Sequence, residues 1–220
     1  FGSNLAPATR AWLPEEIVED VLPARVEGAG VTVNGRDAAV YVVSPSQINF
    51  QVPDGLTDGA VRVEVSNNGA LSNTFSATLR QRAPELFRFL PSTYAAALHT
   101  NYRIAAKPDL FPGCNDAKLC PAAEANPGET ILLYATGLGA TTPASPAGRV
   151  IDAPAPLASP VEVRFGNTAV TAAAWLVSAG LYQINVKVPD SQPDGDVPLT
   201  VSIGGVASTA KTQLTVKRAK

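Results

Sequence analysis

The chain carries one stretch of sequence twice, and this duplication constrains its fold more than any other feature. The first copy, residues 47–72, contains Gln-Ile-Asn-Phe-Gln-Val-Pro-Asp, then Val-Arg-Val-Glu-Val and Ser-Asn-Asn-Gly-Ala-Leu-Ser. The second copy, residues 183–208, contains Gln-Ile-Asn-Val-Lys-Val-Pro-Asp, then Val-Pro-Leu-Thr-Val and Ser-Ile-Gly-Gly-Val-Ala-Ser. Because the spacing is kept residue for residue, the duplication predicts one structural unit used twice.

Apolar and polar residues alternate within each copy. Ile48, Phe50 and Val52 alternate with polar side chains, which is typical of a half-buried strand. Pro53 then ends that strand, because proline has no N–H to donate to a ladder. The chain also contains 19 Pro and 17 Gly, which divide it into short segments. This pattern predicts an all-β fold.

The same alternation predicts individual strands and core residues. Strands are expected at Val31–Asn34, Ala38–Val43, Gln47–Val52, Val61–Val65, Ser72–Leu79, Val161–Phe165, Ala169–Leu176, Leu181–Val188, Val197–Ser202 and Ala207–Val216. Burial is expected for Ile48, Phe50, Val52, Val63, Ile184, Val186, Val188 and Val201.

Short antiparallel strands with turns at close intervals favour a β-sandwich of immunoglobulin type. We predict two tandem immunoglobulin-like sandwiches, at residues 1–86 and 126–220. A Pro-rich connector, residues 87–125, would join them and contain a hairpin around Ala95–Ala106. The acidic segment Pro14–Val21 is expected to form a short helix or a turn.

Charge and hydropathy argue against two kinds of partner. The chain has 17 basic and 19 acidic side chains and a net charge of −2, without the basic excess that nucleic-acid binding needs. No apolar run reaches the roughly 18 residues of a spanning helix, so no membrane insertion is expected. The chain begins at Phe1 and contains no Met, which suggests a processed or trimmed polypeptide.

The two cysteines, Cys114 and Cys120, lie close together in the connector. Two thiols and one histidine, His99, make a poor zinc site. The spacing of the two cysteines favours a small disulfide loop formed in an oxidising compartment. A pair of free thiols is the alternative.

No catalytic or cofactor-binding motif is recognisable. His99 is the only histidine, and there is no Gly-x-Ser-x-Gly elbow and no phosphate-binding loop. Asp190, Asp194 and Asp196 have oxygen ligands suited to calcium, but their spacing is not that of an EF-hand loop. We therefore expect a hydrated turn there, and neither metal nor cofactor.

Two tryptophans are candidate interaction residues. An exposed Trp12 or Trp175 would stack on a sugar or anchor a protein partner. Alternatively, each indole closes one end of a sandwich core. The Gln-x-Asn pairs at residues 47–49 and 183–185 recur in both copies, and we expect their side chains to bond to adjacent loops.

Several further motifs carry a family resemblance. They are Phe1–Ala6, Val31–Gly35, Ser44–Asn49, Ala83–Pro84, Asn126–Gly128, Tyr134–Gly139 and Gly180–Asn185. In this order they resemble the Solibacter-type C-terminal domain family of acidobacterial secreted proteins, over nearly the whole chain. The repeats also resemble IPT/TIG-type immunoglobulin domains. The resemblance implies an exported protein and supplies no catalytic residue.

The two copies differ at their amino-terminal ends. Phe1–Ala6 aligns with Tyr134–Gly139, which the apolar segment Pro127–Leu133 precedes. No counterpart of that segment precedes Phe1, so the first unit is expected to lack one strand. Either the residues were removed, or another polypeptide supplies the strand. Phe1 and Leu5, beside this gap, are therefore further candidate interaction residues.

These observations favour a non-enzymatic structural or adhesive module, extracellular or at the cell surface, and part of a larger protein. The expected partners are another protein or a second copy of the chain, and a polysaccharide is a further candidate. One alternative is a subunit of an extracellular filament assembled by strand complementation. Another is a carbohydrate-binding accessory domain.

Overall fold

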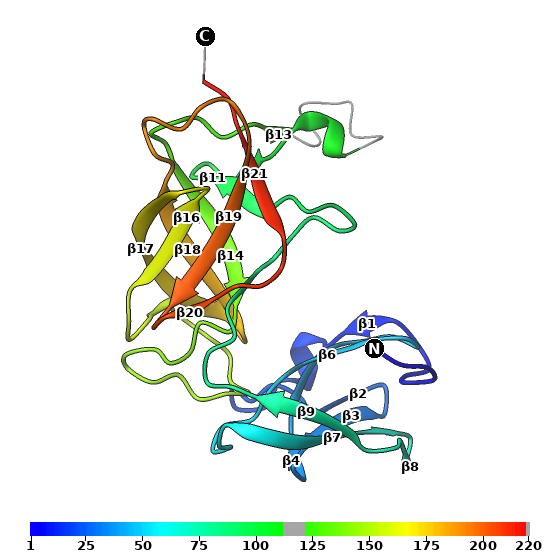
Figure 1. The fold of residues 1–220 in the computed structure, drawn as a ribbon. Helices are drawn as coiled ribbons and strands as arrows, with labels where there is room; N and C mark the ends of the chain where they lie inside the picture. Colours follow the sequence, from blue (N-terminus) through cyan, green and yellow to red (C-terminus); the bar gives the residue numbers. More distant parts are fainter. Residues whose placement is uncertain (112–121, 219–220) are drawn as a thin grey trace. The chain divides into compact units, whose positions relative to one another are not determined.

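The computed structural model describes residues 1–111 and 122–218. The all-β prediction is confirmed, because the regular structure of these residues is almost entirely strand (Figure 1). The helical turns among them are of 3-10 type, η1 (Pro14–Glu16) and η2 (Pro108–Leu110). In this described part of the chain, no helix has the length and apolar character that a membrane crossing requires.

The acidic segment at Pro14–Val21 forms the 3-10 turn η1, followed by a tight turn in which Val18 and Val21 bond to each other through their backbones. Glu16 fixes η1, because its carboxylate accepts a 2.7 Å hydrogen bond from the Leu13 amide. Arg10 also donates two hydrogen bonds to Glu16, at 2.8 and 2.9 Å. These bonds from the Arg10 guanidinium lower the pKa of Glu16 to about 2.

The chain forms two compact units, each made of several segments. Unit 1 is Phe1–Gln81, Ala144–Ala153 and Ser178–Gly180, and unit 2 is Arg82–Pro143, Pro154–Val177 and Leu181–Lys220. The segment Ala144–Ala153 is held within unit 1 by hydrogen bonds to the backbone of Gly148. The Leu22 amide donates to the Gly148 carbonyl at 2.8 Å, and the Gly148 amide donates to Gln51 Oε1 at 2.8 Å.

Unit 1 contains two sheets, which Figure 1 shows as two layers. Its strands are β1 (Arg10–Ala11), β2 (Arg25–Val26), β3 (Ala29–Val33), β4 (Arg36–Asp37), β5 (Ala39–Val43), β6 (Ile48–Gln51), β7 (Gly59–Asn67), β8 (Ala70–Leu71) and β9 (Phe75–Leu79). One sheet has the order β1-β5-β6. The other has the order β2-β3-β7-β8, with β4 paired to β3 and β9 to β7.

Unit 2 contains a larger set of connected strands. They are β10 (Glu85–Leu86), β11 (Ala97–His99), β12 (Ile104–Ala105), β13 (Ala122–Ala123), β14 (Thr130–Thr136), β15 (Ala155–Pro156), β16 (Val161–Phe165), β17 (Thr168–Ser178), β18 (Leu181–Lys187), β19 (Gly195–Ile203), β20 (Val206–Ala207) and β21 (Thr212–Val216). Their order is β13-β12-β11-β14-β18-β17-β16-β19-β20. Strands β10, β15 and β21 pair with β14, β17 and β19.

The hairpin expected around Ala95–Ala106 is present. Its two strands, β11 and β12, run antiparallel with Leu98 opposite Ile104. β11 also pairs with β14, where Leu98 lies opposite Leu132. The described part of the predicted connector is therefore built into unit 2.

The two copies of the repeat have the same strand pairing. Val31 lies opposite Val65 in unit 1, as Val163 lies opposite Val201 in unit 2. A serine closes the following hairpin in the same way in both copies. Ser72 Oγ accepts from the Val65 amide at 3.0 Å, and Ser208 Oγ accepts from the Val201 amide at 3.1 Å. The duplicated sequence thus gives a duplicated structure.

The core prediction is confirmed in unit 2 and only partly in unit 1. Ile184, Val186, Val188 and Val201 are all buried. Their counterparts in unit 1 are less enclosed: Ile48, Phe50 and Val65 are half-buried and Val52 is exposed, while Val63, also expected to be buried, is half-buried. The prediction for Val52 was therefore wrong. The buried centre of unit 1 is a smaller cluster of Ala6, Val26, Ala29, Val40 and Val43.

Candidate strand-docking edge

The feature that distinguishes unit 1 from unit 2 is the free side of β6. On its other side β6 pairs with β5, placing Ile48 opposite Val43 and Gln51 opposite Ala39. Within residues 1–111 and 122–218, no strand pairs with the free side. The backbone groups on that side have no ladder partner, and an exposed row of such groups accepts a further strand. We call this side of Ile48–Gln51 the β6 edge.

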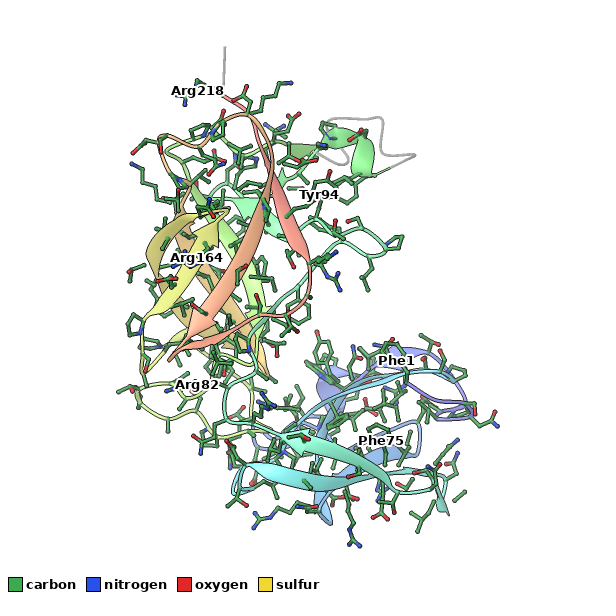
Figure 2. All side chains as sticks on the ribbon, viewed as in Figure 1. Phe1, Phe75, Arg82, Tyr94, Arg164 and Arg218 are labelled. Atoms are coloured by element: carbon green, nitrogen blue, oxygen red, sulfur yellow. The ribbon has the colours of Figure 1, made fainter. Side chains whose placement is uncertain are left out.

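The amino-terminal segment reaches the start of the β6 edge. The Gly2 amide donates to the Ser46 carbonyl at 3.0 Å, and the Leu5 amide donates to the Pro45 carbonyl at 3.1 Å. Ala6 then enters the core cluster of unit 1. Phe1 is fully exposed, and Figures 1 and 2 show it at the amino end of the chain, on the β1-β5-β6 layer.

In unit 2 the corresponding side is occupied. β18, the counterpart of β6, pairs with β14 from Thr130 opposite Lys187 to Ala135 opposite Tyr182. Three alternate side chains of β14 are fully buried, namely Ile131, Leu133 and Ala135. β14 therefore completes both the sheet and the core of unit 2.

The presence of a strand beside β18, and the absence of one beside β6 in the described residues, explain why the equivalent residues Val188 and Val52 differ in burial. Val188 is 0% exposed, and its backbone bonds to the turn that leads into β14: Gly128 N donates to Val188 O at 2.9 Å, and Val188 N donates to Glu129 O at 2.8 Å. Val52 holds the same place in the repeat but is 41% exposed. No described segment of unit 1 covers it as the segment before β14 covers Val188.

Apolar exposure is concentrated in unit 1. Eight of the eleven large apolar side chains that are exposed in the described residues belong to this unit. Phe75 on β9, labelled in Figure 2, lies opposite Val63 and is 65% exposed, whereas Thr212 on β21, which lies opposite the equivalent residue Leu199, is 6% exposed. Unit 1 is thus the less completely covered of the two copies.

The other candidate interaction residues are less exposed than Phe1. Trp12 is half-buried against the core cluster and meets Tyr41 edge to face, with ring centroids 5.9 Å apart. Its buried Nε1 has no hydrogen-bond partner in the described residues. Trp175 is half-buried on β17, opposite Pro156 of β15. Leu5 is also half-buried. Neither tryptophan therefore forms an open aromatic platform.

His99 ties three segments of unit 2 together. Its Nδ1 lies 3.1 Å from Glu129 Oε1, and its Nε2 lies 3.1 Å from the carbonyl oxygen of Ala123. Glu129 stands just before β14, and Ala123 ends β13. These contacts give the histidine a structural position.

The carboxylates considered for calcium have separate partners. Asp190 pairs with Lys187 at 2.8 Å, and Asp194 accepts from the Arg218 amide at 2.9 Å. In the described residues no group of three or more His, Cys, Asp or Glu side chains is arranged to hold a metal ion. Asp196 belongs to a different network.

Asp196 connects β19 to the residues on either side of the β11–β12 hairpin. Its carboxylate accepts from Thr215 Oγ1 at 2.6 Å, Tyr94 Oη at 2.8 Å and Lys107 Nζ at 2.9 Å. Burial alone would raise the pKa of Asp196, but these three bonds outweigh it and keep that pKa below its usual value. The hydrogen bond to Asp196 likewise raises the pKa of Lys107. Sequence analysis missed this network, because its members are far apart in the chain.

The repeated Gln-x-Asn pairs have a different partner from the one expected. Gln47 Nε2 donates to Asn49 Oδ1 at 2.6 Å, and Gln183 Nε2 donates to Asn185 Oδ1 at 2.8 Å. Each pair therefore bonds within its own strand, because residues two apart lie on the same face of a strand. Their retention in both copies reflects this shared local contact.

The remaining site residues, Cys114 and Cys120, lie outside the described residues, so their predicted disulfide stays a prediction. Comparison of the chain with protein-family models and with curated proteins finds no match.

Proposed function

We propose that this chain is a non-enzymatic structural module of an exported protein, acting outside the cell or at its surface. In this proposal its two units are immunoglobulin-like sandwiches of the IPT/TIG kind, related to the Solibacter-type C-terminal domains. The observation that carries the proposal is the β6 edge, where unpaired backbone groups adjoin exposed apolar side chains such as Val52. An edge of this kind suits recognition of another polypeptide segment by strand addition.

The polar side chains support a structural role for unit 2. His99 and Asp196, whose side chains could in principle transfer protons, each contact two or more separate segments of unit 2. Glu85 does the same, accepting hydrogen bonds from the Thr209 amide at 2.7 Å and from Thr209 Oγ1 at 2.6 Å. Contacts of this kind, which join separate segments of one unit, are what a structural role requires.

The half-buried tryptophans favour protein recognition over carbohydrate binding. A sugar-binding platform needs an aromatic face open to solvent. The indole of Trp12 is packed against the core cluster of unit 1, and Trp175 is half-buried on β17. The carbohydrate-binding alternative is therefore the weaker proposal.

The proposed location can be tested with antibodies raised against the 220-residue chain. Intact producing cells should be labelled, and mild protease treatment of those cells should remove the signal. The antibody should also detect a polypeptide longer than this chain. Labelling that appears only after lysis would contradict the proposed function.

A further inference from the structure

The register of unit 2 shows what fits beside β6. In the β14–β18 pair, Leu133 lies opposite Ile184 and Ile131 lies opposite Val186. All four side chains are buried. By the repeat, Ile48 corresponds to Ile184 and Phe50 to Val186. A strand on the β6 edge would therefore place apolar side chains opposite Ile48 and Phe50.

The position of Phe1 fixes where such a strand ends. Ala135 lies opposite Tyr182, and the equivalent residue Gly2 bonds to Ser46, the counterpart of Tyr182. Phe1 thus stands in the place of Tyr134, the next residue along the β14 strand. Residues joined to the amino group of Phe1 would run antiparallel to β6 without any turn.

We propose that the β6 edge is the seat of one antiparallel strand continuous with Phe1. In such a strand the residue joined to Phe1 would lie opposite Ile48 and the third residue before Phe1 opposite Phe50, and both places suit an apolar side chain, as Leu133 and Ile131 do in unit 2. This inference rests on the proposed function and names the occupant of its docking edge. The strand pairs with the free backbone groups of β6 and covers the half-buried side chains of Ile48 and Phe50.

A continuous strand suits this edge better than a strand from a second molecule. The backbone is already paired as far as Gly2, so an incoming separate strand would have to end beside Phe1. A continuous strand meets no such boundary, and β14 of unit 2 shows the continuous arrangement within this protein, because it runs through Tyr134 to Thr136.

The test uses an extended chain in which a copy of residues 126–133 is joined to Phe1. A first control has the same length but carries Asp in place of its copies of Ile131 and Leu133. A second control inserts one Ala between the extension and Phe1, which turns the copies of Ile131 and Leu133 to the opposite face of the sheet, and carries Thr in place of its copy of Leu132 so that no large apolar side chain replaces them. Amide hydrogen exchange is measured at Ile48–Gln51, together with the mass of the particle in solution.

The extended chain should remain monomeric, and exchange at Ile48–Gln51 should slow by roughly tenfold or more, equivalent to about 1.4 kcal/mol. Both controls should exchange like the 220-residue chain. The proposal is overturned if the extension leaves β6 exchange unchanged, or if both controls protect β6 equally well. It is also overturned if the 220-residue chain protects β6 by assembling with other copies.

These outcomes separate this inference from the proposed function. An intracellular location of the protein would contradict the proposed function and leave the strand assignment intact. Failure of the extension to protect β6 would refute the strand assignment while leaving an exported structural role open to its own test.

Discussion

The backbone amide of Gly2 donates a hydrogen bond to the carbonyl oxygen of Ser46 across 3.0 Å. This contact sets the register of the amino-terminal segment against β6. The backbone pairing ends at this contact, because no strand in the described residues pairs with the β6 edge. The equivalent strand of unit 2, β18, is paired along its length with β14. The two copies therefore share a topology but differ in how fully they are closed.

Equivalent core isoleucines should differ in their contribution to stability. Ile184 is 0% exposed, so Ile184→Ala should lower the free energy of unfolding of unit 2 by about 2–5 kcal/mol. Ile48→Ala should cost unit 1 less than half as much, because Ile48 is only half-buried.

Each unit contains one of the two tryptophans, so fluorescence during urea unfolding follows each unit separately. Unit 1 is followed by Trp12 in a Trp175→Phe background, and unit 2 by Trp175 in a Trp12→Phe background. Each alanine variant is compared with its own background. Equal losses at the two sites would contradict the difference in closure.

The hairpin serines provide a second matched pair. Ser208 Oγ accepts from the Val201 amide in a partly buried setting, so Ser208→Ala should cost about 0.5–1.5 kcal/mol. Ser72→Ala should cost less, because Ser72 is exposed and water replaces the lost acceptor. Urea unfolding of both variants measures the difference, and a larger loss at Ser72 would count against this account.

Glu85 should make unit 2 less stable in acid. Burial raises the pKa of Glu85, but hydrogen bonds from Thr209 and Ala210 outweigh it, so the pKa lies below its usual value of 4.5. A carboxyl group whose pKa is lowered by folding stabilises the protein above its unfolded-state pKa. That contribution is lost as the pH falls through the folded-state value.

Glu85→Gln should therefore cost about 1 kcal/mol at neutral pH, a low value for a charged hydrogen bond because the group is partly solvated. The difference in stability between this variant and the wild type should shrink as the pH falls below 4.5, the usual pKa of a glutamate. Glu162→Gln is the control, because Glu162 forms an exposed ion pair with Arg164 and should change stability little. Urea unfolding at several pH values measures both variants. A loss at Glu85 that is constant across this range would be inconsistent with the hydrogen-bond account.

The predicted Cys114–Cys120 disulfide can be tested directly. Non-reduced protein should have a mass two hydrogens below that of the reduced chain, because oxidation of two thiols to a disulfide removes two protons and two electrons. Alkylation before reduction should leave both cysteines unmodified. Two alkylated thiols in freshly isolated protein would refute the disulfide and weaken the proposed extracellular location.

The repeat and the alternating pattern were sufficient to predict the all-β class and the buried side of β18. They failed at Val52, because alternation reports which side chains face a core and not whether a neighbouring strand covers them. Val188 follows the same pattern and is covered by the segment before β14. The burial of Val188 thus depends on that neighbouring segment and not on the alternating pattern of its own strand.

Long-range polar contacts were beyond prediction from sequence. Asp196 bonds to Tyr94 and Lys107, and nothing in the local pattern of these residues relates them. The bond between Gln and Asn in each Gln-x-Asn pair could have been predicted from the sequence, because residues two apart in a strand lie on the same face. The structure of the β11–β12 hairpin was also predictable, since its strands are close in sequence.

The most direct test of the central claim compares amide hydrogen exchange at β6 and β18 in the 220-residue chain. We expect the amides of Ile48–Gln51 to exchange at least roughly a hundredfold faster than their counterparts at Ile184–Lys187, because an edge strand opens locally more easily than a strand paired on both sides. Equal protection of the two strands, with the protein monomeric, would contradict the claim that unit 1 has an unfilled strand position.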